Sequence, residues 1–217
     1  MLPFPILFEN NYFIIINKPS GMPVYTTKHT QQAKSVEDFF PLLSKRKEGP
    51  WLVHRLDQDT AGCLLIALRK QALIQAQRCF EKKQVTKTYW AIVQGKPKTL
   101  AGTIQAPLLK TIINKTWKII VDPKGQKAIT MWKLLGSNGT ISCLELTLLT
   151  GRTHQARVHC AYIGHPIVGD PIYSPNARTH HSLQLLSRSI QLPLSPPLHA
   201  VADPELSMRE LLKACNL

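Results

Sequence analysis

Four short hydrophobic segments constrain the fold of this chain more than any other feature of its sequence. Each has the length and the β-branched or aromatic residues typical of one strand, and Gly, Pro and Asn residues that favour turns separate them. In chain order they are KTYWAIVQG (87–95), TWKIIVD (116–122), AITMWKLL (128–135) and ISCLELTLL (141–149). Strands that follow one another over short turns pair antiparallel. We therefore expect an α+β fold with a mainly antiparallel sheet and helices on one side.

The helices are predicted from amphipathic spacing and from capping residues. In the longest candidate, apolar residues recur every three or four positions, with Arg, Lys and Gln on the opposite face. Ser35 and Thr153 each precede a shorter candidate, and such residues often cap a first helical turn. We expect helices at residues 69–85, 35–43, 154–163 and about 204–213.

Two further segments have an interpretable local pattern. IIINKPSGMPV (14–24) is predicted to be a strand that ends in a tight turn, followed by a polar, mobile loop from Tyr25 to Lys34. LVHRLDQDTAGCLLIAL (52–68) is interpreted as two strands around a turn, with Asp57 at the end of the first. The length fits one domain over residues 1–217, with a motif-bearing core at 17–173 and a covering tail at 178–217.

The charge of the chain points to a polyanionic partner. The net charge is +14, and residues 45–133 hold 18 of the 27 Lys and Arg but only 5 of the 13 Asp and Glu. RNA, DNA or an anionic membrane surface would each attract such a chain. No apolar stretch is long enough to span a bilayer. The five cysteines are widely separated without a CxxC pair, which favours a reduced, intracellular compartment.

Asp57 and Asp59 lie beside Arg55, and three roles are open to them from sequence. They could cap a turn, bind a metal or act as a catalytic acid, and turn capping is the commonest of these. A metal site is not expected, because the segment offers too few ligands. A hydrolase with paired carboxylates would need a second acid such as Asp59, Glu81 or Asp122.

Residues 150–173 contain Arg152, His154, Arg157 and His159 near a predicted helix start. This pattern is consistent with an anion site or with a solvated basic helix. Arg157 lies away from the apolar stripe of its helix, so it is expected to meet a carboxylate, and Asp57 is one candidate. No phosphate loop, dinucleotide fingerprint or zinc spacing is present, so the chemistry is expected to use side chains without a cofactor or metal.

Four motifs of this chain, in order, resemble the RluA family of pseudouridine synthases. They are NKPSG (17–21), HRLDQDTAG (54–62), KTYWAIVQG (87–95) and GRTHQARVH (151–159), and IGHPIVGDPIY (163–173) extends the last. The resemblance implies a bent mixed sheet with flanking helices, crossed by an RNA-binding cleft. It also implies an isomerase of the cytoplasm, expected to be a monomer, that converts uridines in structured ribosomal or transfer RNA without a cofactor. Only sixteen residues precede Asn17, so no S4-like domain is expected there.

The resemblance assigns roles to individual residues. Asp57 corresponds to the essential carboxylate, Tyr89 to the tyrosine that stacks on the target base, and Arg157 to the arginine paired with the aspartate. Arg55 corresponds to the residue that fills the space left by the flipped nucleotide. Further RNA contacts are expected from the remaining basic motif residues, which are Lys18, His54, Lys87, Arg152 and His154.

Two segments depart from the family pattern, at three positions in all. Ala61 stands where a Ser is usual, and Leu186 with Ser187 stands where the family has His-Ala after a Leu. Two other functions are kept as alternatives. One is a catalytically inactive RNA-binding relative, and the other is a nucleoside or glycoside hydrolase that would release the free base.

Overall fold

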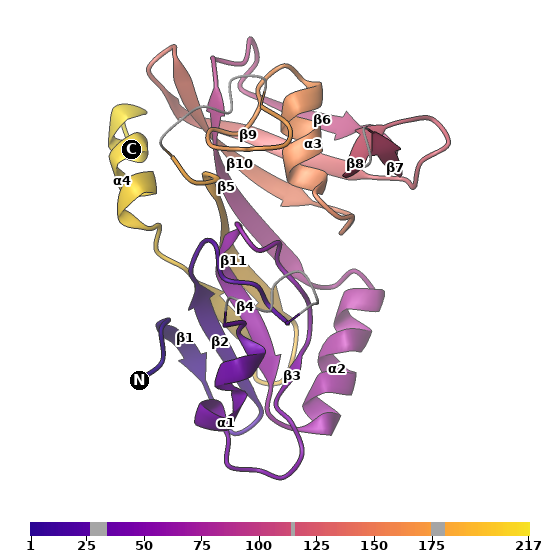
Figure 1. Cartoon of the computed structure of the whole chain (residues 1–217), viewed down its shortest axis with the longest axis vertical. Coiled ribbons are helices and arrows are strands. Elements are labelled where there is room, and N and C mark those ends of the chain that lie inside the picture. The colour runs from indigo at the N-terminus through magenta and orange to yellow at the C-terminus, as the bar shows by residue number, and fades with distance from the viewer. Residues whose placement is uncertain (27–33, 114–115, 175–180) are drawn as a thin grey trace. The chain divides into compact units, whose positions relative to one another are not determined.

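The computed structural model describes residues 1–26, 34–113, 116–174 and 181–217 (Figure 1). The fold is α+β, as expected, with antiparallel strands predominating. The chain divides into two compact units, each described here by itself. Unit 1 contains Met1–Lys87 and Leu186–Pro204, and unit 2 contains Thr88–Leu185 and Glu205–Leu217. The single domain expected over the whole chain therefore stays a prediction.

Unit 1 is built around strand β4. One edge of β4 pairs antiparallel with β2, which also pairs with β1. The other edge pairs with β11 in parallel near its start and with β3 near its end. The elements are β1 (Ile6–Glu9), β2 (Phe13–Lys18), a 3-10 turn η1 (Glu37–Phe39), α1 (Phe40–Leu43), β3 (Trp51–Leu52), β4 (Ala61–Ala67), α2 (Lys70–Glu81), β11 (Leu185–Leu192) and β12 (Leu198–Val201).

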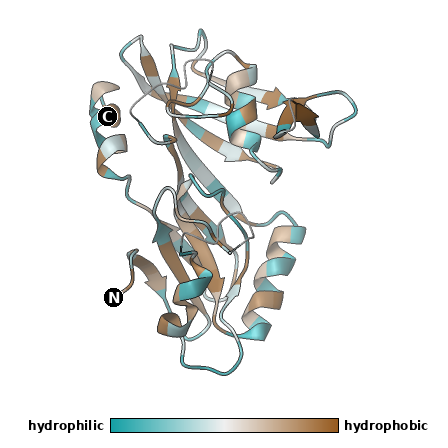
Figure 2. Ribbon diagram, viewed as in Figure 1, coloured by the Kyte–Doolittle hydropathy of each residue, from teal (hydrophilic) through white to brown (hydrophobic). Residues whose placement is uncertain are grey.

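The sequence of β4 explains its central place. All seven of its residues are buried, and a strand buried on both faces has a continuous apolar sequence instead of an alternating one. Figure 2 shows that β2 and β4 are largely hydrophobic. Helix α2 buries Ala72, Ala76 and Cys79 at helical spacing, which leaves its charged face in solvent.

Unit 2 contains a four-stranded antiparallel sheet in the order β5, β10, β9, β6, and a separate β7–β8 hairpin. Leu108 and Ile119 of the hairpin form a core cluster with Ala128 and with Val158 of α3. The elements are β5 (Thr86–Gln94), β6 (Ala101–Gln105), β7 (Leu108–Ile113), β8 (Thr116–Val121), β9 (Ile129–Ser137), β10 (Ile141–Leu148), α3 (Gln155–Tyr162) and α4 (Leu206–Ala214).

The four strands and the long helix predicted from sequence are confirmed within a few residues, and two predictions about chain segments are corrected. The segment before Asp57 forms a strand only at Trp51–Leu52, and residues 53–60 are a loop. Residues 185–201 of the expected covering tail form β11 and β12 and belong to the sheet. Of the expected loop at 25–34, residues 27–33 lie outside the described part of the chain.

The predicted cap at Thr153 is also wrong. His154 precedes α3 in a left-handed conformation, with φ of 53°, and makes no side-chain cap. The side chain of Gln155 holds the start of the helix instead, because its oxygen accepts hydrogen bonds from the Thr150 hydroxyl and the Arg152 N–H.

Gly62 is required by the close approach of β4 and β11. Its φ is +108°, and a Cβ atom there would collide with the Ser187 carbonyl. We expect Gly62→Ala to lower the free energy of unfolding by about 3 kcal/mol, because backbone strain and a collision with β11 add. Gly139→Ala is the control, since Gly139 has a φ of +91° with open space around it. In Gly139→Ala only the backbone strain should lower the free energy of unfolding, by about 1 kcal/mol. Equal losses of this free energy in urea denaturation of the two variants would show that the contact with Ser187 does not matter.

Candidate active site

The loop that carries Asp57 is held in place through its backbone. The Thr60 N–H donates to the Asp57 carbonyl at 3.1 Å and closes a turn over residues 57–60. The Gln58 carbonyl accepts from the Lys18 ammonium at 2.8 Å, and the Asp59 carbonyl accepts from the Ser20 hydroxyl at 2.8 Å. The NKPSG turn thus fixes the position of the Asp57 loop, and Asp57 itself is half-buried.

Lys18 is a structural residue of this site. Its side chain is fully buried, and its ammonium also donates to the carbonyls of Pro19 at 2.9 Å and Met22 at 2.8 Å. An ammonium group has three donors, and a buried charge needs such partners. The prediction that Lys18 contacts RNA is therefore corrected: a phosphate cannot reach this nitrogen, and the residue joins two motif loops.

Arg55 lies on the exposed side of the same loop. Its guanidinium stands over the ring of Tyr25, 5.4 Å from the ring centroid. A planar cation that stacks on one ring can also stack on a nucleobase. The predicted RNA contact of Arg55 is compatible with this exposure.

His54 faces the interior of unit 1. Its Nε2 accepts a hydrogen bond from the Leu65 N–H at 3.1 Å, and its ring stacks on Phe80 with centroids 5.3 Å apart. Burial, and to a lesser extent the charge of Lys87, lowers the pKa of His54 to about 3. The imidazole is therefore neutral near pH 7. The ring braces the Asp57 loop against β4 and α2, and the RNA contact of His54 remains a prediction.

The burial of His54 predicts a loss of stability in acid. An unfolded His has a pKa near 6.5, so below this pH the unfolded chain binds a proton that the folded chain does not, and the free energy of unfolding falls. Between pH 7 and pH 5 we expect His54 to account for a loss of about 2 kcal/mol. His54→Gln keeps an acceptor for the Leu65 N–H and should remove this loss in urea denaturation.

The buried His159 should keep part of the dependence of stability on pH in the His54→Gln variant. Burial also lowers the pKa of His159, so part of the acid sensitivity should remain in His54→Gln. An unchanged dependence on pH in His54→Gln would mean that His54 titrates normally in the folded protein.

Lys87 and Tyr89 both lie on β5, with Lys87 at the end of unit 1 and Tyr89 in unit 2. The Lys87 ammonium stands over the Phe80 ring at 5.5 Å, and Lys87 is half-buried. Tyr89 is buried and lies opposite Leu146 of β10. The RNA contact of Lys87 and the catalytic role of Tyr89 remain predictions.

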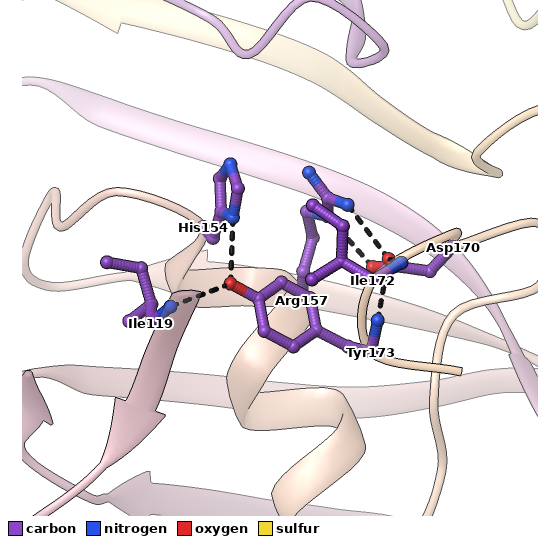
Figure 3. Close-up of polar contacts among 6 residues, drawn as sticks. All are labelled: Ile119, His154, Arg157, Asp170, Ile172 and Tyr173. Atoms are coloured by element: carbon purple, nitrogen blue, oxygen red, sulfur yellow. Dashed lines mark hydrogen bonds and ion pairs between the residues drawn. The ribbon is translucent and has the colours of Figure 1, made fainter. Parts of the chain in front are cut away.

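Arg157 is anchored by a carboxylate that the sequence analysis did not single out. Its Nε and one terminal nitrogen each donate to Asp170 at 2.8 Å, one to each carboxylate oxygen (Figure 3). The Asp170 carboxylate also accepts from the N–H groups of Ile172 at 2.9 Å and Tyr173 at 3.0 Å. The side chains of Arg157 and Asp170 are 3% and 0% exposed, so neither charge is compensated by water.

The pKa of Asp170 shows that the ion pair prevails over burial. Burial raises the pKa of this carboxyl, but the hydrogen bonds and charge of Arg157, with the two backbone donors, lower it further than burial raises it. Asp170 is therefore ionised at neutral pH. One signal in the sequence could have identified Asp170: it lies in the GDPIY motif, shortly after the predicted helix that carries Arg157. The pairing of Arg157 with Asp57 stays a prediction.

An aromatic cluster continues from this ion pair toward the β7–β8 hairpin. The Tyr173 ring lies beneath the Arg157 guanidinium at 5.3 Å, and its hydroxyl lies 2.8 Å from His154 Nδ1 and accepts from the Ile119 N–H (Figure 3). The His154 ring also lies 5.0 Å from Trp117. His154 is only 9% exposed, which counts against its predicted role as a surface contact for phosphate.

A buried polar network fixes the start of α3 and hence Arg157. Gln155 donates to the Thr130 hydroxyl at 3.0 Å, which lies 2.8 Å from His159 Nδ1, and His159 Nε2 lies 2.9 Å from the Ala106 carbonyl. Because every member has partners, the network can be buried at little cost. Arg152 stays exposed, with its Nε donating to the Lys127 carbonyl, so an RNA contact there remains predicted.

The two departures from the family pattern meet in the sheet. Ala61 of β4 lies opposite Leu186 of β11, and both are buried. Ser187 lies opposite Gly62, and its hydroxyl donates to the Cys63 carbonyl at 3.4 Å. Ala61 and Leu186 thus form an apolar pair that leaves no polar side chain without a partner. The Ser187 hydroxyl, which an Ala would lack, has its own acceptor.

Neither a metal cluster nor a membrane helix is found in the part of the chain that the structure describes. No three His, Cys, Asp or Glu side chains there gather closely enough to hold a metal ion. Among the same residues, every helix is too short or too polar to cross a bilayer.

Comparison with known proteins identifies the family. Residues 12–162 match the RNA pseudouridylate synthase family. An RNA pseudouridine synthase of Zymomonas mobilis is 40% identical over 184 residues, covering 83% of each chain. The ribosomal large subunit pseudouridine synthase D of the same organism is 34% identical over 189 residues, covering 84% of this chain and 59% of its own. The ribosomal large subunit pseudouridine synthase C of Vibrio parahaemolyticus is 37% identical over 170 residues, covering 77% and 52%.

The fold agrees with the sequence matches. The solved structure of human RNA pseudouridylate synthase domain containing 4 superposes with a TM-score of 0.83 at 28% identity, covering 97% of this chain and 92% of that one. The chain therefore belongs to the RNA pseudouridylate synthase family, whose members are isomerases. Its similarity to synthases C and D is consistent with the RluA group that its motifs resemble.

Proposed function

We propose that this protein converts specific uridines of structured ribosomal or transfer RNA to pseudouridine, with Asp57 as the essential carboxylate. The observation that carries the proposal is the Asp57 loop itself. In a chain of this family, Lys18 and Ser20 hold the carbonyls of Gln58 and Asp59, the two residues after Asp57, and this supports a fixed position for Asp57 in its turn. Preorganised groups of this kind are what a reaction without a cofactor needs.

The reaction requires bond exchange at one sugar carbon without redox change. The N1 to C1′ bond of uridine breaks, the base turns over, a C5 to C1′ bond forms, and C5 loses its proton. Asp57 can attack C1′ or stabilise its positive character, or it can abstract a sugar proton, and all three need the ionised carboxylate. Arg157 is proposed to pair with that carboxylate and to hold it in position for the sugar.

The RNA is proposed to present its target base out of the stack. Unstacking costs a few kcal/mol, which Arg55 in the vacated space and Tyr89 against the base would offset. The exposed position of Arg55 supports its part in this step. The names of the relatives that act on the large ribosomal subunit support ribosomal RNA as a substrate, and transfer RNA is the second candidate. We further propose that the protein acts as a monomer in the cytoplasm, in accord with five buried, free cysteines.

Tritium release from RNA labelled at uridine C5 tests the proposal. The protein is incubated with ribosomal and with transfer RNA transcripts, and the nucleosides of the product are separated. Tritium in water together with pseudouridine in the RNA is the expected result. Free uracil in place of pseudouridine would instead identify a hydrolase, and bound RNA without either product would identify an inactive relative.

A further inference from the structure

A groove of about 450 Å³ lies in unit 1, outside the site described above. It is formed where the loop before β3 meets the end of β4 and the start of α2. Trp51 and the buried Leu68 supply its apolar surface. Four basic side chains also line it, namely Arg46, Lys47, Arg69 and Lys70.

The charge of this groove is largely uncompensated. Glu48 is the one carboxylate that lines it, and the first turn of α2 contains no acidic residue. Arg69 is partly engaged, because its Nε donates to the Asn11 carbonyl at 3.0 Å and its guanidinium stands over Tyr12. Arg46, Lys47 and Lys70 are exposed and extend the positive charge into solvent.

The apolar surface gives the groove a second property. Trp51 is half-buried, and its indole ring packs against Gly49, where a Cβ atom would collide with the ring. An indole held in this way is a platform on which a base can stack. An aromatic platform beside lysines and arginines suits an unpaired nucleotide, whose base is apolar on its faces and whose phosphates are anionic.

The groove and the Asp57 loop lie at opposite ends of the same strand. Asp57 precedes β4, whereas Leu68 follows it directly, and the seven residues from Ala61 to Ala67 span about 20 Å. A contact in this groove would therefore hold a part of the RNA distant from the target uridine.

We infer that this groove binds an unpaired nucleotide of the RNA substrate, with its base on Trp51 and its phosphates on Arg46, Lys47 and Lys70. The inference rests on the proposed function, because it takes RNA as the substrate. The site adds affinity and register for structured RNA and takes no part in the chemistry.

Ultraviolet crosslinking locates the bound nucleotide. The wild-type protein is irradiated with a 12-nucleotide oligouridylate, digested with trypsin and examined by mass spectrometry. A uridine adduct is expected on the peptide Glu48–Arg55, and fragmentation of this peptide should place the adduct on Trp51 and not on Arg55. Adducts confined to other peptides would overturn the inference.

Charge reversal tests the phosphate contacts. The double variant Lys47→Glu/Lys70→Glu is compared with Lys96→Glu/Lys98→Glu, which changes the same net charge at two exposed lysines of unit 2. Fluorescence anisotropy with the labelled oligouridylate should show binding about tenfold weaker in the first variant than in the second. The slope of log affinity against log salt should also fall by about 1.4, since each phosphate contact contributes about 0.7. Equal losses in the two variants would mean that the groove contributes only general charge.

Two further results separate this inference from the proposed function. Trp51→Leu should weaken oligouridylate binding about tenfold, while Trp51→Phe, which keeps a ring, should retain most of it. Lys47→Glu/Lys70→Glu and Trp51→Leu should still form pseudouridine at saturating RNA. Pseudouridine formation without a Trp51 adduct would refute the groove and leave the proposed function intact, and an adduct without pseudouridine would do the reverse.

Discussion

Replacing Asp57 with Asn is expected to abolish pseudouridine formation, by about 10⁴-fold or more, while RNA binding is retained. Asn has the shape of Asp but cannot act as a nucleophile or base, and the loop is held by backbone carbonyls that the substitution does not alter. Tritium release measures the activity, and anisotropy with labelled RNA measures binding. A variant that loses binding as strongly as turnover would show that Asp57 serves the loop and not the reaction.

Asp59→Asn is the matched control for this experiment. Asp59 lies in the same loop and holds Ser20 through its carbonyl, so its side chain is expected to be dispensable for turnover. If both variants lose turnover to the same degree, two carboxylates take part. That outcome would favour the hydrolase, which needs a second acid, and the product analysis would then show free base.

The positions of the strands were predictable where their sequences are typical of a strand. The segments at 87–95, 116–122, 128–135 and 141–149 all form strands, because β-branched and aromatic residues bounded by turn residues favour a strand whichever partner it pairs with. Strand β11 was missed although it lies beside β4. Its pairing with β4 joins residues more than a hundred positions apart and leaves no local signal, and its hairpin with β12 was missed as well.

The roles of charged residues were harder to predict than the strands. Lys18 and His54 were expected on an RNA-binding surface because they are basic and lie in motifs. The structure buries Lys18 among carbonyls and makes His54 a neutral acceptor. Burial depends on the packing of distant segments, so residue type and motif position identified residues that matter but not the way in which they act.

For Arg157 the kind of partner was predictable from the sequence, but the particular residue was not. Its position on a predicted helix correctly indicated a carboxylate partner, and the structure provides Asp170. The sequence suggested Asp57 because that residue already had a proposed role. Since one guanidinium has five donors, a bidentate pair with Asp170 leaves capacity for a second acceptor, and both pairings are chemically compatible.

Replacing Asp170 with Asn is expected to lower the free energy of unfolding by about 3 to 5 kcal/mol and to reduce activity strongly. The substitution keeps an oxygen that accepts from the Ile172 and Tyr173 N–H groups. It removes the negative charge of Asp170 from beside the Arg157 guanidinium, which is 3% exposed. Urea denaturation at pH 7 measures the effect. The pKa of Asp170 is lowered in the folded protein, so its contribution to the free energy of unfolding is complete at neutral pH. This contribution falls only when the pH drops below the ordinary pKa of Asp.

The double variant Arg157→Met/Asp170→Asn separates stability from catalysis. Removing both charges avoids a buried cation beside a neutral side chain at position 170, so most of the lost stability should return. A double-mutant cycle measures this recovery as a coupling free energy. If Arg157 only supports the fold, activity should return together with stability. If Arg157 also pairs with Asp57 and positions it for the reaction, the double variant should be stable but inactive. Full activity in the stable double variant would refute the role proposed for Arg157 in the reaction.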